Sequence, residues 1–103
     1  MKYIFEIRFR EGQSEAEYIS TWKKNSQIIQ TFPGAEGTIL HRKIGEPGTL
    51  IAIASWNSKA DRDKAFQTII DTMPNHDEIL HKHEHLGEIT VIGNFDSFQQ
   101  ELL

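Results

Sequence analysis

Hydrophobic and polar positions follow two different periods along this chain, and the two periods alternate. Residues 2–9 place apolar side chains at every second position, a period typical of a strand. Residues 38–44 carry a charged end that is typical of an edge strand. Residues 49–56 are apolar on both faces, which favours a central strand, and residues 88–95 alternate again. A turn of composition Gly-Glu-Pro-Gly at residues 45–48 joins the second and third strands as a hairpin.

Two longer segments show the period of a helix. Ser14, followed three residues later by Glu17, is a capping box, so a helix should begin there and end at Pro33-Gly34. Ser58 with Asp61 predicts a second helix start. Each helix carries one apolar stripe. The stripes contain Tyr18, Ile19, Trp22, Ile28, Ile29 and Phe32 in the first helix, and Ala65, Phe66, Ile69, Ile70 and Met73 in the second.

The order strand-helix-strand-strand-helix-strand predicts an α+β fold. It is an antiparallel sheet with two helices on one face and nothing from the same chain on the other. An uncovered sheet face needs a partner, so we expect a second copy of the chain, in a homodimer, to cover it. Glu6 and Arg8 lie on that face, and we expect them to make polar contacts inside the dimer. A short helix capped by Asn75 and a tail at residues 96–103 complete the chain.

Composition narrows the classes of function. At 103 residues we expect one domain, residues 1–103, with its core at residues 2–95. A formal charge of −4 gives no basic field for nucleic acid. The absence of cysteine excludes disulfides, cysteine-ligated metals and thiolate nucleophiles. No apolar run approaches the roughly 18 residues that cross a bilayer, and the N-terminal run is not a signal peptide, so we expect a cytoplasmic protein without membrane contact.

Histidines are the first candidates for chemistry. His76 and His83 fall on the apolar side of the short helix, where a half-buried imidazole could abstract a proton; each could equally be a core or rim residue bonded to backbone. His81, His83 and His85 form a run that could bind a metal ion. Because no third or fourth ligand is defined elsewhere, we expect a solvated connection and no metal site.

Aromatic residues are the second candidates. Trp22 and Trp56 would belong to the core on the simplest interpretation. In a cleft between sheet and helix they would also present flat walls to an aromatic ligand. Phe5, Ile7, Phe66 and Met73 lie on the same apolar faces and are further candidates for lining such a cleft.

The segments Pro33-Gly34-Ala35-Glu36-Gly37 and Trp56-Asn57-Ser58-Lys59-Ala60, in this order of elements, resemble the antibiotic biosynthesis monooxygenase family over about residues 2–95. The resemblance implies a ferredoxin-like monomer, with elements in the order βαββαβ, that pairs with a second copy to form a dimeric α+β barrel. It also implies a cleft for flat aromatic ligands, quinols or haem between sheet and helices. Several members oxidise their substrates with molecular oxygen and without metal or flavin.

Haem-degrading members of this family carry an asparagine on the first strand and a tryptophan midway along the second helix. Phe5 or Ile7 stands at the first position here, and Lys64 or Ala65 at the second, so the resemblance argues against haem degradation. A histidine near the end of the second helix is matched in part by His76.

The resemblance implies a cofactor-independent monooxygenase, or a related small oxidoreductase, that acts on an aromatic, phenolic or quinol-like molecule. His76 or His83 would serve as base, and the ligand would lie against Phe5, Ile7, Trp22, Trp56, Phe66 and Met73. The alternative is a non-catalytic dimeric module that binds a hydrophobic metabolite or acts as a stress-related accessory protein. Metal binding through residues 81–85 is a third possibility.

Overall fold

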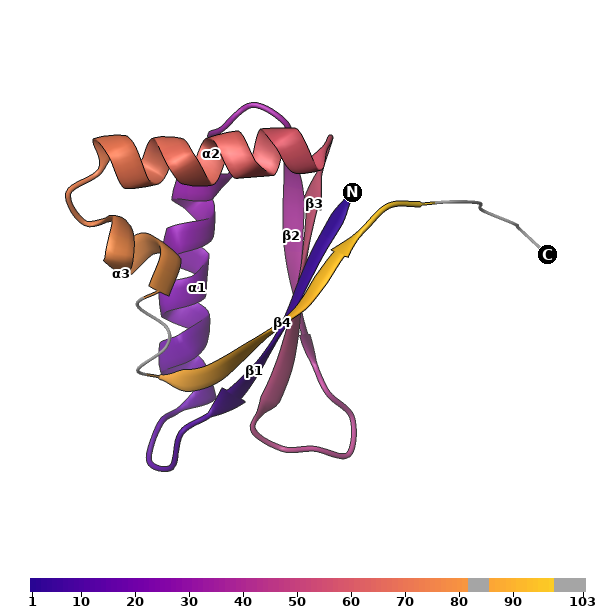
Figure 1. Ribbon diagram of the computed structural model, residues 1–103. Coiled ribbons are helices and arrows are strands. Elements are labelled where there is room, and N and C mark those ends of the chain that lie inside the picture. Colours follow the sequence, from indigo (N-terminus) through magenta and orange to yellow (C-terminus); the bar gives the residue numbers. More distant parts are fainter. Residues whose placement is uncertain (82–85, 98–103) are drawn as a thin grey trace.

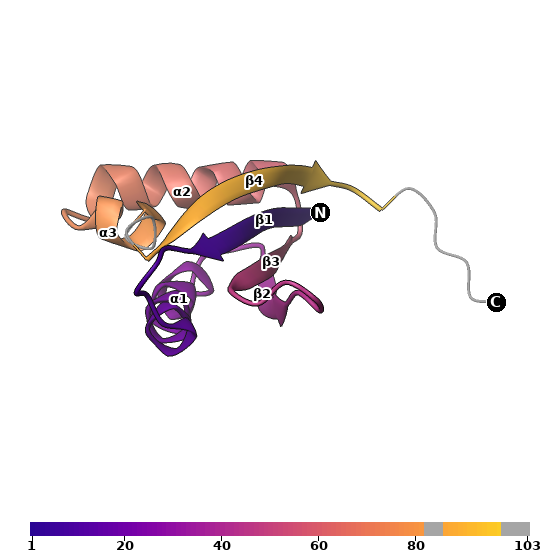
Figure 2. The same ribbon diagram turned by 90° about the horizontal axis from the view of Figure 1, so that it is seen from below.

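The computed structural model describes residues 1–81 and 86–97. The described residues form a four-stranded sheet and three helices. Figure 1 shows the helices gathered at one side of the sheet, and Figure 2 shows the same arrangement after a quarter turn. The elements in chain order are β1 (Lys2–Phe9), α1 (Glu15–Ile29), β2 (Ala35–Arg42), β3 (Thr49–Trp56), α2 (Lys59–Thr72), α3 (His76–His81) and β4 (Gly87–Phe95). The predicted α+β, ferredoxin-like order is confirmed, with α3 as an additional short helix between α2 and β4.

The sheet has the order β2-β3-β1-β4, and every neighbouring pair is antiparallel. β3 is therefore central and β2 lies at an edge, as their compositions predict. Ile7 of β1 is opposite Leu50 of β3 on one side and Ile89 of β4 on the other. This register places Tyr3, Phe5, Ile7 and Phe9 on the face that meets the helices.

The two serine caps are formed as predicted. The Ser14 hydroxyl accepts the backbone N–H of Glu17 at 3.1 Å, and the Ser58 hydroxyl accepts the backbone N–H of Asp61 at 3.1 Å. Each cap satisfies one of the N–H groups that the first turn of a helix leaves without a partner. Both helices therefore begin where the sequence places them.

Three elements differ from the prediction in where they begin or end. α1 ends at Ile29, before Pro33-Gly34, because the next residues form tight turns in which Thr31 N–H donates to Ile28 O. β2 covers Ala35–Arg42 instead of residues 38–44, since Ala35 already pairs with Trp56. β4 begins at Gly87, which the prediction had placed before the strand. A Cβ there would lie 2.8 Å from the carbonyl oxygen of Arg8, so only glycine allows β4 to approach β1 this closely.

The hydrophobic core lies between the sheet and the helices. Ile7, Tyr18, Leu50 and Ala52 are buried together, and Phe5, Phe9, Trp22, Leu40, Leu86 and Ile89 pack around them. Burial raises the pKa of the Tyr18 phenol well above its usual value. This core fixes α1 against β1 and β3.

The opposite face of the sheet is apolar at its centre. Ile39, Ile53 and Ile4 stand next to one another in register across β2, β3 and β1, and the Ile39 side chain is 61% exposed. Beside this row Arg8 donates from Nε to Glu6 Oε1 at 2.8 Å. The described helices all lie on the other side of the sheet (Figure 1), so the face with these isoleucines is the open face that the order of elements predicts.

Gly34 provides a stability test of the turn that leads into β2. Its φ of +87° is in the left-handed region, and a Cβ would lie 2.6 Å from side-chain atoms of Asp61 at the start of α2. We expect Gly34→Ala to lower the free energy of unfolding by about 3 kcal/mol, through backbone strain together with overpacking. Urea unfolding followed by circular dichroism measures this loss.

Gly12→Ala is the matched control for that measurement. Gly12 has a similar φ of +81°, but nothing lies within 4 Å of its Cβ position. We expect Gly12→Ala to lower the free energy of unfolding by only about 1 kcal/mol, through backbone strain alone. Equal losses in the two variants would show that contact with Asp61 contributes nothing.

Candidate ligand cleft

Two adjoining cavities lie between the sheet and the helices. The smaller has a volume of about 60 Å³ and the larger about 350 Å³, and we refer to the two together as the cleft. Their linings have five residues in common: Tyr3, Phe5, Ile29, Phe66 and Ile79. The larger volume falls in the range of small-molecule sites in proteins. The cleft therefore lies between the sheet and the helices, where the resemblance implies one, and it has room for a small molecule.

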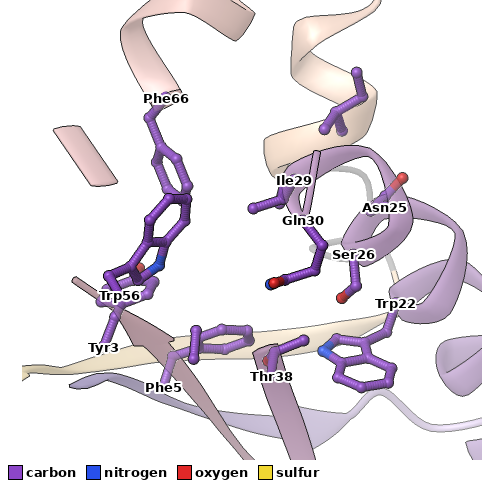
Figure 3. A pocket seen from close by; sticks show the side chains of 12 residues that line it. Tyr3, Phe5, Trp22, Asn25, Ser26, Ile29, Gln30, Thr38, Trp56 and Phe66 are labelled. Atoms are coloured by element: carbon purple, nitrogen blue, oxygen red, sulfur yellow. The ribbon is translucent and has the colours of Figure 1, made fainter. Parts of the chain in front are cut away.

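One wall of the cleft is aromatic (Figure 3). The Phe66 ring meets Tyr3 edge to face at a centroid distance of 6.3 Å, and meets Trp56 in the same way at 6.4 Å. Phe5 continues this surface, with its ring centroid 5.6 Å from that of Tyr3. Edge-to-face contacts hold the rings in fixed orientations. β1, β3 and α2 thus combine to present flat surfaces to the cavity.

The facing wall comes from α1 and is more polar (Figure 3). It carries Trp22, Asn25, Ser26 and Gln30. The Gln30 carboxamide oxygen accepts the backbone N–H of Gly37 at 2.8 Å, and the Asn25 amide donates to the backbone carbonyl of Glu78 at 3.3 Å. These two bonds tie α1 to β2 and to α3. Asn25 is a buried polar residue on a stripe where the sequence predicts only apolar contacts.

Arg62 is the charged residue among the lining residues that sequence reasoning missed. It belongs to α2 and lines the larger cavity, and its side chain is only 16% exposed. Its Cζ atom lies 4.0 Å from the centroid of the Tyr3 ring. Its position one turn before Phe66 is the only sequence signal that could have indicated contact with the cleft.

Of the predicted ligand-binding residues, Phe5, Trp22, Trp56 and Phe66 line the cleft. Ile7 lines neither cavity, because it is completely buried beneath Tyr18 and Leu50. Met73 also lines neither cavity; it is the C-cap of α2, one residue beyond the helix. The structure thus brings four of the six together, and a role in ligand contact stays a prediction for each.

His76 lies at the start of α3 and lines neither cavity. Its Nδ1 is 2.9 Å from the carbonyl oxygen of Met73. A carbonyl oxygen can only accept, so a hydrogen bond between these atoms requires the proton to be on Nδ1. The other ring nitrogen, Nε2, lies 3.4 Å from Asp77 Oδ1. The predicted role of His76 as a base would therefore require a substrate that extends beyond the cleft.

His83 lies outside the described residues, as do Lys82, Glu84 and His85 of the histidine run. Within residues 1–81 and 86–97, no three histidine, aspartate or glutamate side chains are grouped to hold a metal ion. Across the same part of the chain, no helix has the length and apolar character needed to cross a membrane.

No protein-family profile matches this sequence, and no curated protein is significantly similar to it. Comparison of structures is more informative. A variant of SnoaB, a cofactor-independent oxygenase from Streptomyces nogalater, superposes with a TM-score of 0.80 over 96% of this chain and 93% of that chain, at 17% identity. A second structure of SnoaB gives a TM-score of 0.65 over 96% and 98% of the two chains.

A candidate antibiotic biosynthesis monooxygenase from Deinococcus radiodurans superposes with a TM-score of 0.65, at 11% identity, over 98% of this chain and 99% of that chain. The chain has the fold of the antibiotic biosynthesis monooxygenases. A further candidate member, from Chloroflexus aurantiacus, has a TM-score of 0.63 at 14% identity and covers 95% and 97% of the two chains. At these identities the likeness to the antibiotic biosynthesis monooxygenases establishes the fold, and function has to be argued from the cleft.

Proposed function

We propose that this protein is a cofactor-independent monooxygenase, or a related small oxidoreductase, that acts on an aromatic, phenolic or quinol-like molecule. The observation that carries the proposal is the cleft with its aromatic wall of Tyr3, Phe5, Trp56 and Phe66. The similar fold of SnoaB, a cofactor-independent oxygenase, supports it. Flat rings lining an apolar cavity favour a flat, electron-rich ligand.

The chemistry of such a reaction requires little from the protein beyond positioning. In an anthrone-type substrate, an activated CH2 loses a proton and leaves a carbanion delocalised over the ring. The carbanion gives electrons to O2 and forms a C–O bond, and the proton returns to make a hydroperoxide. Loss of water then leaves a carbonyl. One oxygen atom enters the product and the other leaves as water, together with the two hydrogens of the CH2 group.

Oxygen consumption tests this proposal. We expect uptake above the buffer rate with anthrone- or quinol-type substrates. For an anthrone, the ratio should be one O2 per substrate, and catalase should release no oxygen afterwards because water is the co-product. No uptake above buffer across such a panel, with folded protein, would contradict the proposal.

A pair of variants connects the oxygen uptake to the cleft. Ile29 borders both cavities, so Ile29→Trp should fill the cleft and lower the rate at least about ten-fold by displacing the substrate. Ile44 is 99% exposed in the hairpin, so Ile44→Trp should leave the rate unchanged. A rate that survives in Ile29→Trp would place the reaction elsewhere.

The second candidate function is a non-catalytic module that binds a hydrophobic metabolite. One observation favours it: among the described residues, no carboxylate and no histidine lines the cleft. A ligand that binds in the cleft without any uptake of oxygen would support this function over the first.

For either function we propose a homodimer, with the open face as the interface. The row of Ile39, Ile53 and Ile4 is the apolar centre of that face. Burying three such side chains against a second copy would remove apolar surface from water, which is the main favourable term in protein association.

A further inference from the structure

Arg62 brings a positive charge to the wall of the larger cavity, and none of the described residues that line this cavity is acidic. The other lining residues are all uncharged: Tyr3, Phe5, Ile29, Phe66, Ile70, Ile79, Leu80, Ile89 and Val91. A buried charge among apolar groups is costly unless an opposite charge or hydrogen bonds compensate it. The composition of this wall therefore favours a negatively charged ligand.

Two rings hold the guanidinium group in place. Its Cζ atom lies 4.0 Å from the centroid of Tyr3 and 4.4 Å from that of Phe66. Both rings also line the larger cavity, so the cation is part of the same wall. Cation–π contacts of this kind are attractive, but they leave the N–H donors of the guanidinium available for an acceptor.

The hydrogen-bonding capacity of Arg62 is largely unused. Its Nη1 donates to Asp63 Oδ1 at 3.2 Å, yet Asp63 is 48% exposed and binds Lys59 Nζ more closely, at 2.6 Å. Lys59 is accordingly the main cause of the lowered pKa of Asp63. The Nε atom of Arg62 is buried and has no hydrogen-bond partner within residues 1–81 and 86–97. An unsatisfied buried donor is unfavourable, and an anionic oxygen at the guanidinium group would offset part of that cost.

We infer that the cleft takes its aromatic ligand as an anion, with a carboxylate or phenolate oxygen at Arg62 and the ring against Tyr3 and Phe66. Charge-assisted hydrogen bonds from a guanidinium to an anionic oxygen are stronger than neutral ones, and the geometry suits a planar acid. The inference relies on the proposed function only in that the cleft is the ligand site. Arg62 thereby becomes the residue that selects among aromatic molecules of similar shape.

Two pairs of probes test this selection by isothermal titration calorimetry. 2-Naphthoate is compared with the neutral 2-naphthamide, and an ionised nitrophenol is compared with its methyl ether. We expect at least one anion to bind about ten-fold or more tightly than its neutral partner. Binding of both members of each pair with equal affinity would overturn the inference. Failure of all four to bind, as expected if a second copy of the chain filled the cleft, would overturn it too.

Three variants assign the preference to Arg62. Arg62→Met keeps an apolar stem of similar length, so we expect the anion preference to disappear while the neutral probes bind as before. Arg62→Lys keeps the charge and should retain part of the preference. Lys59→Gln removes a neighbouring cation that does not line the cleft, and the preference should persist. A full preference in folded Arg62→Met would refute the assignment.

These measurements are independent of oxygen chemistry. A clear anion preference without any oxygen uptake would reject the proposed monooxygenase and leave the anion site standing. Oxygen uptake with neutral quinols, but without any anion preference, would reject the anion site and support the proposed monooxygenase.

Discussion

Ile53→Lys should dissociate the proposed homodimer into monomers. Ile53 lies at the centre of the open face, between Ile39 on β2 and Ile4 on β1. A lysine there would bring an unpaired ammonium group into the centre of the proposed interface, where charge is costly. We expect the dissociation constant of the dimer to rise at least about 100-fold, measured by sedimentation equilibrium.

Ile44→Lys is the control for this experiment. Ile44 is also an isoleucine on the surface, but it is 99% exposed in the hairpin between β2 and β3. We expect the dimer of the Ile44→Lys variant to have the same dissociation constant as the dimer of the unmodified chain. A stable, folded species of 11.9 kDa for the unmodified chain at micromolar concentration would contradict the proposed dimer altogether.

Ile7→Ala should lower the free energy of unfolding by more than Phe66→Leu, a substitution in the lining of the cleft. Ile7 is completely buried and packs against Tyr18, Leu50 and Ala52. Truncating a buried isoleucine removes transfer free energy and leaves a cavity, together about 2–5 kcal/mol. Total stabilities of domains are only about 5–15 kcal/mol. We therefore expect a large loss in urea unfolding, measured at fixed protein concentration.

Phe66→Leu is the counterpart that should affect the ligand instead. It removes a ring that contacts Tyr3, Trp56 and the Arg62 guanidinium while keeping an apolar side chain. We expect weaker binding of 2-naphthoate and a smaller loss of stability than in Ile7→Ala. Weaker binding in Ile7→Ala than in Phe66→Leu, with both proteins folded, would show that Ile7 contributes to the site after all.

Local sequence signals, namely helix caps and hydrophobic periodicity, predicted the order of the helices and strands correctly. Serine caps at Ser14 and Ser58 mark both long helices correctly, because a cap is a contact over three residues and needs no tertiary information. The period-two pattern of residues 2–9 correctly separates the two faces of β1. Element ends were harder to predict, since β2 begins where Ala35 meets Trp56, a contact between segments distant in the sequence.

The site was predicted in part, for a related reason. The aromatic residues of the cleft lie on apolar stripes that the sequence displays directly. Arg62 is different: on a helix that faces solvent on one side, an arginine is an ordinary surface residue. Only the packing of α2 over β1 places it on the Tyr3 ring and buries its Nε atom. Likewise, no periodicity could show that Asn25 bonds to the carbonyl of Glu78.

The alternation of side chains along β1 has a consequence for how this protein can change. Tyr3 and Phe5 border the cleft, whereas Ile4, between them, belongs to the uncovered row of isoleucines. On the proposed function and the proposed dimer, substrate preference and self-recognition would depend on alternating residues of a single strand, whose side chains lie on opposite faces of the sheet. Directed evolution of Tyr3 and Phe5 could therefore change the substrate preference without changing the oligomeric state.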